Sequence, residues 1–160
     1  KAEVSFKHQD VRVGDARITG SLDMLEVDKK NKTIVVTDYK TGHPSLAWDK
    51  GDDHTKLKLH KYRQQLIFYK ILVENSAEYH DYTVVGGQLA FIEPTKAGET
   101  IILSLDLENV DTKPTEQLIQ AVWKHICMLD LPDTTAYSAD FKGVLAFEQG
   151  LIDEIVQKML

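Results

Sequence analysis

The sequence predicts an α/β fold in which helices flank a central mixed β-sheet. Three observations predict it: strand-like segments fill the first forty positions, a long amphipathic segment follows, and two further strand-like segments come after that. At 160 residues and 42% hydrophobic content, the chain is long enough for one well-filled core. We therefore expect a single domain over residues 1–160.

The first part of the chain predicts three strands joined as a meander. Runs rich in β-branched residues cover Glu3 to Val13, Arg17 to Val27 and Lys32 to Tyr39. Turn-forming residues separate them, at Gly14-Asp15 and in the segment 28–31. Consecutive strands with such short turns are expected to pair with one another.

Three helices and two more strands are predicted after a polar loop. Apolar residues at three- and four-residue steps indicate a long helix from about Thr55 to Asn75. Strands are expected at Tyr82 to Ile92 and at Glu99 to Leu107. A second helix begins at Pro114 and is stopped by Pro132, and a last helix spans roughly 147–160. Its apolar stripe favours core packing, with a partner surface as the alternative: Leu151, Ile152, Ile155, Val156, Met159.

The charge distribution argues against nucleic-acid binding by the whole surface, because the formal net charge is −6. One segment differs: between Lys50 and Lys70, six basic and two acidic residues give +4. Cys127 is the only cysteine, so it forms no internal disulfide, and its helical context predicts a buried position. No apolar run is long enough to cross a bilayer, so we expect a soluble protein with no membrane partner. The single cysteine fits the reducing cytoplasm, where we expect the protein.

A candidate metal site lies in the second and third predicted strands. Asp38 and Lys40 are two residues apart, and alternate residues of a strand share a face. A hairpin would lay Asp23 across from Asp38. Mg2+ prefers hard oxygen ligands, and the backbone carbonyl of Tyr39 is a plausible third one. With such a metal, Lys40 would orient the nucleophile or stabilise the transition state of phosphodiester hydrolysis. The alternative is a surface salt bridge, which an Asp-x-Lys pattern alone favours.

The order of the motifs adds a resemblance to a known family. Gly20-Ser21-Leu22-Asp23 is followed by Asp-Tyr-Lys-Thr-Gly at 38–42, and then by Gln65 and Tyr69 in the long helix. This set resembles the RecB-like nucleases of the PD-(D/E)XK superfamily. The resemblance implies a restriction-endonuclease-like core in which Asp23 and Asp38 bind Mg2+ or Mn2+. It also implies that Lys40 is catalytic and that the Gln-x-x-x-Tyr helix lines the DNA-binding face.

The same resemblance carries expectations about the protein's context. Related nucleases occur as C-terminal modules of UvrD/Rep-type helicases and carry an upstream helix with a further metal ligand. We therefore expect a fragment of a longer chain that lacks this helix, with a helicase domain as its partner and a role in DNA repair or recombination. An iron–sulfur cluster, which some relatives hold with four cysteines, is not expected with Cys127 alone.

The basic segment then predicts a DNA contact, because Lys56, Lys58, Lys61 and Arg63 lead into the helix of Gln65. The leading hypothesis is a metal-dependent deoxyribonuclease, most simply an exonuclease. One alternative is a non-catalytic nucleic-acid-binding module that keeps the nuclease fold. Another is an interaction domain that docks a partner through its C-terminal stripe, which leaves the ordered motifs unexplained.

Overall fold

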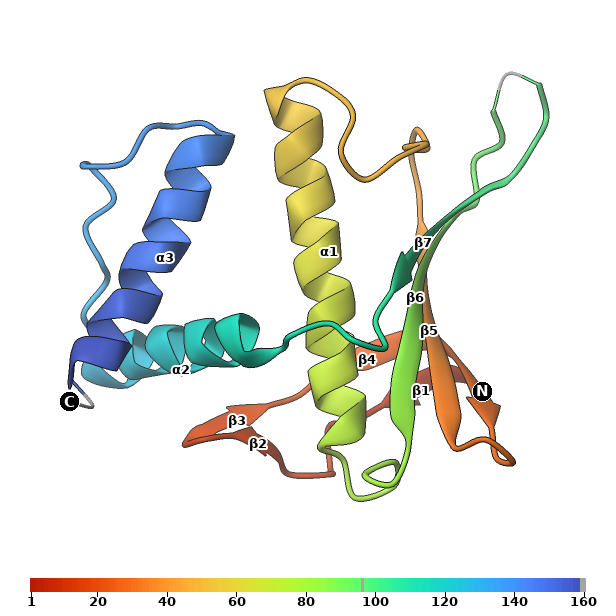
Figure 1. Cartoon of the computed structure of the whole chain (residues 1–160), viewed down its shortest axis with the longest axis horizontal. Helices are drawn as coiled ribbons and strands as arrows, with labels where there is room; N and C mark the ends of the chain where they lie inside the picture. The colour runs from red at the N-terminus through yellow and green to blue at the C-terminus, as the bar shows by residue number, and fades with distance from the viewer. Residues whose placement is uncertain (96, 159–160) are drawn as a thin grey trace.

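The computed structural model describes residues 1–95 and 97–158, and it is built on a five-stranded sheet (Figure 1). The strand order is β1-β4-β5-β6-β7. Only β5 and β6 run parallel, and the other neighbours are antiparallel. The predicted mixed sheet is therefore confirmed. Its strands are β1 Ala2–Ser5, β4 Ser21–Asp28, β5 Thr33–Lys40, β6 Thr83–Phe91 and β7 Ile101–Asp106.

The first two predicted strands are each broken, so their predicted continuity is wrong. The antiparallel order of the predicted meander is kept by β1, β4 and β5. Residues Val11–Val13 and Ala16–Ile18 form a separate two-stranded hairpin, β2 and β3, outside the main sheet. Asp10 adopts a left-handed backbone conformation with φ of 47°, which interrupts the extended chain. The apolar residues change phase across this break, from even positions at Val4 and Phe6 to odd ones at Val11 and Val13, with the polar segment 7–10 between them. This change was the available signal that the chain leaves the sheet.

Helix α1, Asp53–Glu74, connects the parallel strands β5 and β6 and packs against both. Its start is two residues before the predicted Thr55, since Asp52 caps it by accepting a hydrogen bond from the Thr55 amide at 2.9 Å. Gly87 lets the helix lie close to the sheet, because a Cβ there would meet side-chain atoms of Leu66 and Leu107 at 3.0 Å. The height of α1 above the sheet is therefore set partly by one missing side chain.

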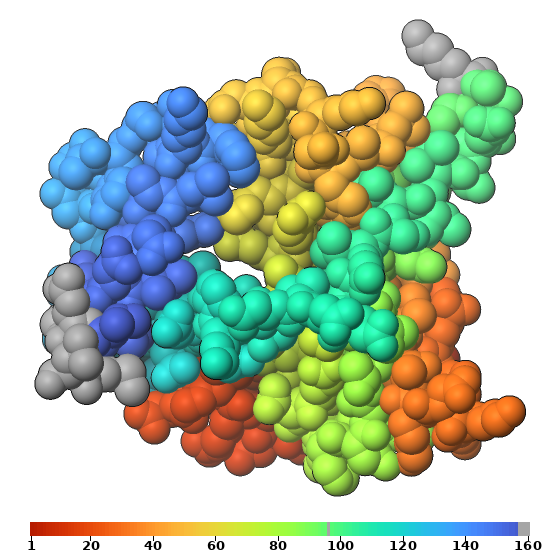
Figure 2. Space-filling model, viewed as in Figure 1, coloured from red at the N-terminus to blue at the C-terminus, as the bar shows by residue number. Residues whose placement is uncertain are grey.

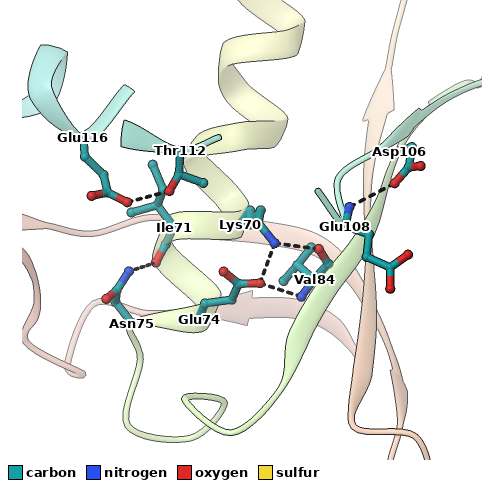
Figure 3. A network of polar contacts seen from close by, with 9 residues as sticks. All are labelled: Lys70, Ile71, Glu74, Asn75, Val84, Asp106, Glu108, Thr112 and Glu116. Atoms are coloured by element: carbon teal, nitrogen blue, oxygen red, sulfur yellow. Dashed lines mark hydrogen bonds and ion pairs between the residues drawn. The ribbon is translucent and has the colours of Figure 1, made fainter. Parts of the chain in front are cut away.

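A buried polar network fastens the end of α1 to the start of β6 (Figure 3). Lys70, which is 5% exposed, donates hydrogen bonds to Glu74 Oε1 at 2.7 Å and to the Val84 carbonyl at 2.9 Å. Glu74 Oε1 also accepts from the Val84 amide at 2.7 Å. Lys70 thus contributes to the fold and is withdrawn from the basic surface in which the sequence placed it. Removing one partner would leave a buried charge unpaired.

Helices α2, Lys113–Met128, and α3, Phe141–Lys158, pack on each other and contact α1 (Figure 1). The last helix begins earlier than predicted, because Asp140 accepts a hydrogen bond from the Gly143 amide at 2.7 Å. Its predicted end, with Met159 and Leu160, lies outside the described residues. In the apolar stripe Leu151 is buried and Val156 is 40% exposed.

The expected burial of Cys127 is wrong, because its thiol is exposed. Within α2, Ala121 alone is fully buried. Other apolar side chains of α2, such as Ile126, are likewise open to solvent. A membrane-crossing helix, long and apolar enough for the purpose, is not found within residues 1–95 and 97–158.

Candidate active site

Asp38 lies near the end of β5, on the sheet face that α1 covers. Ile34 and Val36 share this face and are fully buried, while Asp38 is 4% exposed. Its Oδ1 atom accepts two hydrogen bonds from α1, from Gln65 Nε2 and from the Tyr69 hydroxyl, each at 2.8 Å. One oxygen of the carboxylate is therefore fixed from the helix.

The second oxygen of Asp38 is buried and accepts no hydrogen bond within the described residues. Its close contact is an ion pair with Lys40, whose Nζ lies 2.7 Å away without hydrogen-bond alignment. Counted on the side chains alone, 6% of the Asp38 surface and 15% of the Lys40 surface are exposed, so both groups are largely buried. A buried carboxylate oxygen without a donor is costly unless another partner completes its coordination.

Lys40 is held from two other sides. Its Nζ donates a hydrogen bond to Gln65 Oε1 at 2.7 Å and lies 4.5 Å from the ring centroid of Tyr62. Gln65 also donates from Nε2 to the Tyr69 hydroxyl at 2.6 Å. A single amide on α1 thus touches the carboxylate, the lysine and the tyrosine. This confirms that the Asp-x-Lys pair shares one face, and it excludes a solvent-facing surface salt bridge.

Asp23 approaches the same place from β4. The ladder between β4 and β5 ends with Met24 opposite Thr37, so the next position brings Asp23 beside Asp38. There Asp23 Oδ2 accepts a hydrogen bond from the Tyr39 amide at 2.8 Å, in place of a backbone carbonyl of β4. The N–H and C=O of one strand residue point toward the same neighbour. The Tyr39 carbonyl therefore also faces the strand that carries Asp23.

The electrostatics of Tyr69 support this convergence. Burial raises the pKa of its hydroxyl well above the ordinary value, and the hydrogen bond to Asp38 and the charges of Asp38 and Asp23 raise it further. Both carboxylates are therefore close enough to act on one phenol. Burial, followed by the charge of Asp38, also raises the pKa of Tyr62. Both phenols remain neutral donors at physiological pH.

The donor set fits a hard divalent cation. Asp38 supplies a buried oxygen without a donor, Asp23 supplies a second carboxylate, and the Tyr39 carbonyl faces the same strand gap. No group of three or more His, Cys, Asp or Glu residues suited to a metal is found in the part of the chain that the structure covers. Two carboxylates and a carbonyl would be the protein ligands of such a cation, a number that Mg2+ accepts because it keeps several waters.

The four basic residues predicted to contact DNA do not form one surface. Lys58 and Lys61 line a cavity beside Tyr62. Lys56 and Arg63 line a different cavity, in which the Arg63 guanidinium lies 5.6 Å from the Trp48 ring. Lys58 and Lys61 therefore lie on one side of α1, and Lys56 and Arg63 lie on the other, because their spacing along the helix places each pair on its own face.

Tyr62 is a site residue that the sequence assigned only to the apolar face of the helix. Its ring contacts Lys40, and its position is three residues before Gln65 and seven before Tyr69. That helical spacing places it on the same side of α1 and was the available signal. Its apolar character concealed this signal, because an aromatic residue at such a position is most often core.

Fold and site together define an α/β protein with two carboxylates and a lysine gathered at the end of the central strand of a mixed sheet. A family model of the PD-(D/E)XK nuclease superfamily matches residues 1–142. The chain belongs to this superfamily, whose members are generally nucleases and typically use divalent metals such as Mg2+. No curated protein and no solved structure shows a significant match to the chain.

Proposed function

We propose that the chain is a metal-dependent DNA nuclease domain of the RecB-like type, most simply an exonuclease. The observation that carries this proposal is the buried Asp38 oxygen without a hydrogen-bond donor, next to Lys40 and near Asp23. Superfamily membership supports the nuclease class. The motif order supports the finer RecB-like assignment, and with it a helicase domain in the same full-length chain and a role in DNA repair or recombination.

In this proposal Asp23, Asp38 and the Tyr39 carbonyl hold the divalent cation. The chemistry that such a cation supplies when bound is Lewis-acid stabilisation of the charge that develops on the phosphate. Lys40 orients the attacking water and offsets charge at the phosphate through its ammonium group. Because Gln65 fixes both the ammonium and Asp38, the geometry is set before substrate arrives.

The tyrosine and glutamine of α1 act as positioning residues in this scheme. Tyr69 is 8% exposed and donates its hydroxyl hydrogen bond to Asp38 Oδ1, so Oδ2, which faces Lys40, is the oxygen that we propose as the metal ligand. Gln65 is partly accessible and reaches both Asp38 and Lys40. Their predicted contact with DNA therefore remains part of the proposal, with Gln65 the better placed of the two.

Cleavage of labelled linear DNA, single- and double-stranded, tests the proposal. Product should form with Mg2+ or Mn2+, disappear with EDTA, and be absent for Asp38→Asn and Lys40→Ala. Lys32→Ala is the matched control, because this lysine is paired with Asp81 on the surface and lies outside the site. Metal-independent cleavage, or full activity of the Lys40 variant, would contradict the assigned roles.

A non-catalytic nucleic-acid-binding module is the second candidate. It is favoured by one observation, that no third acidic or histidine ligand joins Asp23 and Asp38 within the described residues. It would bind DNA with unchanged affinity when EDTA is added and would cleave no DNA under any metal. Retention of both carboxylates and of Lys40 in one contact cluster favours the enzyme.

A further inference from the structure

A cleft of about 690 Å3 opens directly beside Lys40, between α1, α2 and the β2–β3 hairpin. One wall comes from α1, with Lys61, Tyr62 and Phe68, and the facing wall from α2, with Trp123 and Ile126. Figure 2 shows an opening bounded by α1, α2 and α3. Of these helices, α1 and α2 supply the residues that line the cleft. The volume is in the range of small-ligand sites.

The chemistry of the walls is selective. Three aromatic side chains and a row of aliphatic ones provide apolar surface, and several remain exposed, including Val122 at 42% and Ile126 at 55%. The charged residues among the lining are Arg17, Lys40 and Lys61, with no carboxylate among them. In a chain of net charge −6, such a cleft is complementary to an anion that also carries flat apolar groups.

A second cavity of about 550 Å3 continues the same track. It shares Lys61, Tyr62 and Gln64 with the first and adds Lys58 and His60, together with one carboxylate, Glu148, which is paired with His60 at 2.9 Å. Tyr62 therefore stands between the two cavities, with Lys40 at 4.5 Å and Lys58 at 5.7 Å from its ring centroid. Cations thus recur along a line of aromatic rings, which is the pattern that binds the phosphates and unstacked bases of a single strand.

From these contacts we propose that the cleft binds unpaired nucleobases of single-stranded DNA, with Trp123 as a stacking residue. The proposal rests on the nuclease function above and adds the strand class. Bases in a duplex have both faces covered by their neighbours, so they present no ring to Trp123 or Phe68. Duplex DNA is therefore held by its phosphates alone, and a single strand gains the additional contacts of the cleft.

Tryptophan fluorescence in EDTA, where the nuclease makes no cut, tests the cleft. Trp48→Phe leaves Trp123 as the single tryptophan, since the chain holds two. We expect an oligothymidylate to quench this fluorescence and to bind roughly tenfold or more tightly than an abasic strand of equal length and charge, given the value of base stacking. A duplex of the same length should behave like the abasic strand.

Variants of Trp123 in the original background, followed by the anisotropy of labelled strands, complete the test. Trp123→Ala should abolish the preference for thymidylate over the abasic strand, and Trp123→Phe should retain most of it. Equal binding of the two strands, or a preference unchanged by Trp123→Ala, overturns the proposal. If metal-dependent cleavage persists in that case, the nuclease function stands and only the cleft assignment fails. Base-dependent binding without any cleavage would instead support the cleft and contradict the nuclease function.

Discussion

Asp23 Oδ2 takes the place of a backbone acceptor for the Tyr39 amide, at 2.8 Å, where strands β4 and β5 separate. The carboxylate that we propose as a metal ligand is thereby held by the main chain of the strand that bears Asp38. An asparagine keeps an amide oxygen for this hydrogen bond, whereas it loses the charge. The structural and the chemical contributions of position 23 are therefore separable.

For Asp23→Asn we expect a melting temperature close to that of the original chain and a cleavage rate lower by roughly 10²-fold or more, because metal stabilisation amounts to several kcal/mol. Asp23→Ala should show the same loss of rate and a lower melting temperature. Calorimetry and a gel-based cleavage assay measure the two quantities. A rate that survives in Asp23→Asn would remove Asp23 from the metal site.

Divalent metal should stabilise the folded chain, because the buried Asp38 Oδ2 has an ion pair with Lys40 but accepts no hydrogen bond within the described residues. At a metal concentration one hundred times Kd, linkage predicts about 2.7 kcal/mol of additional unfolding free energy. Urea titrations with Ca2+ or Mg2+ against EDTA measure it. Asp38→Asn should show no such increment, and an equal increment in that variant would mean that the metal binds elsewhere.

The paired glycines of β6 provide a test of how α1 is positioned. A Cβ at Gly87 would meet Leu66 and Leu107 at 3.0 Å, while one at Gly86 would meet Val35 at 3.5 Å, an ordinary contact. We expect Gly87→Val to cost about 1–3 kcal/mol through overpacking and to lower cleavage by moving Gln65. Gly86→Val is the matched control and should be far milder. Equal urea midpoints for the two variants would contradict this account.

The two basic sides of α1 should differ in their effect on DNA affinity. Lys58 and Lys61 lie beside Tyr62 and the site, whereas Lys56 and Arg63 lie beside Trp48. We expect Lys58→Ala with Lys61→Ala to weaken single-strand binding and to reduce the slope of log K against log salt by roughly 0.7 for each phosphate that is no longer neutralised. The pair Lys56→Ala and Arg63→Ala serves as the comparison. The assignment fails if that second pair has the larger effect on the slope.

Tyr69 should make stability sensitive to alkaline pH. Burial and the hydrogen bond to Asp38 raise its pKa above the ordinary 10.0, so the folded state holds a proton that the unfolded chain releases. Its contribution is complete below pH 10.0 and is lost as pH rises above that value. Tyr69→Phe should therefore lose less stability between pH 8 and pH 10.5 than the original chain, as urea midpoints would report. Parallel pH profiles would exclude this role.

Much of the architecture follows from local patterns in the sequence. The long helix, the strands around it and the start of α2 at Pro114 were predicted from periodicity and turn residues, and the structure confirms them. The break at Asp10 was missed, although the polar segment 7–10 and the shift of the apolar residues from even to odd positions mark it. The early start of α3 depends on Asp140 as a cap, and this polar residue is not part of the apolar stripe from which the helix was predicted.

The core of the site was also accessible from the sequence, since Asp38 and Lys40 share a face through strand periodicity alone. The contacts of Gln65 with both were not, because they depend on how closely α1 approaches the sheet. Likewise the basic segment looked uniform in sequence, although the fold buries Lys70 against Glu74 and divides the rest between two sides. Tertiary packing decides these features, and no local pattern encodes it.

The amide of Gln65 has a chemical direction: its oxygen accepts from Lys40, while its nitrogen donates to Asp38 and to the Tyr69 hydroxyl. A glutamate at this position would still accept the hydrogen bond from Lys40 but would place a second negative charge next to Asp38. A lysine at this position would repel Lys40. Only a primary amide carries acceptor and donors on one planar group of this size. If the proposed nuclease function holds, a change of residue 65 should therefore disable the site even where both acidic residues persist.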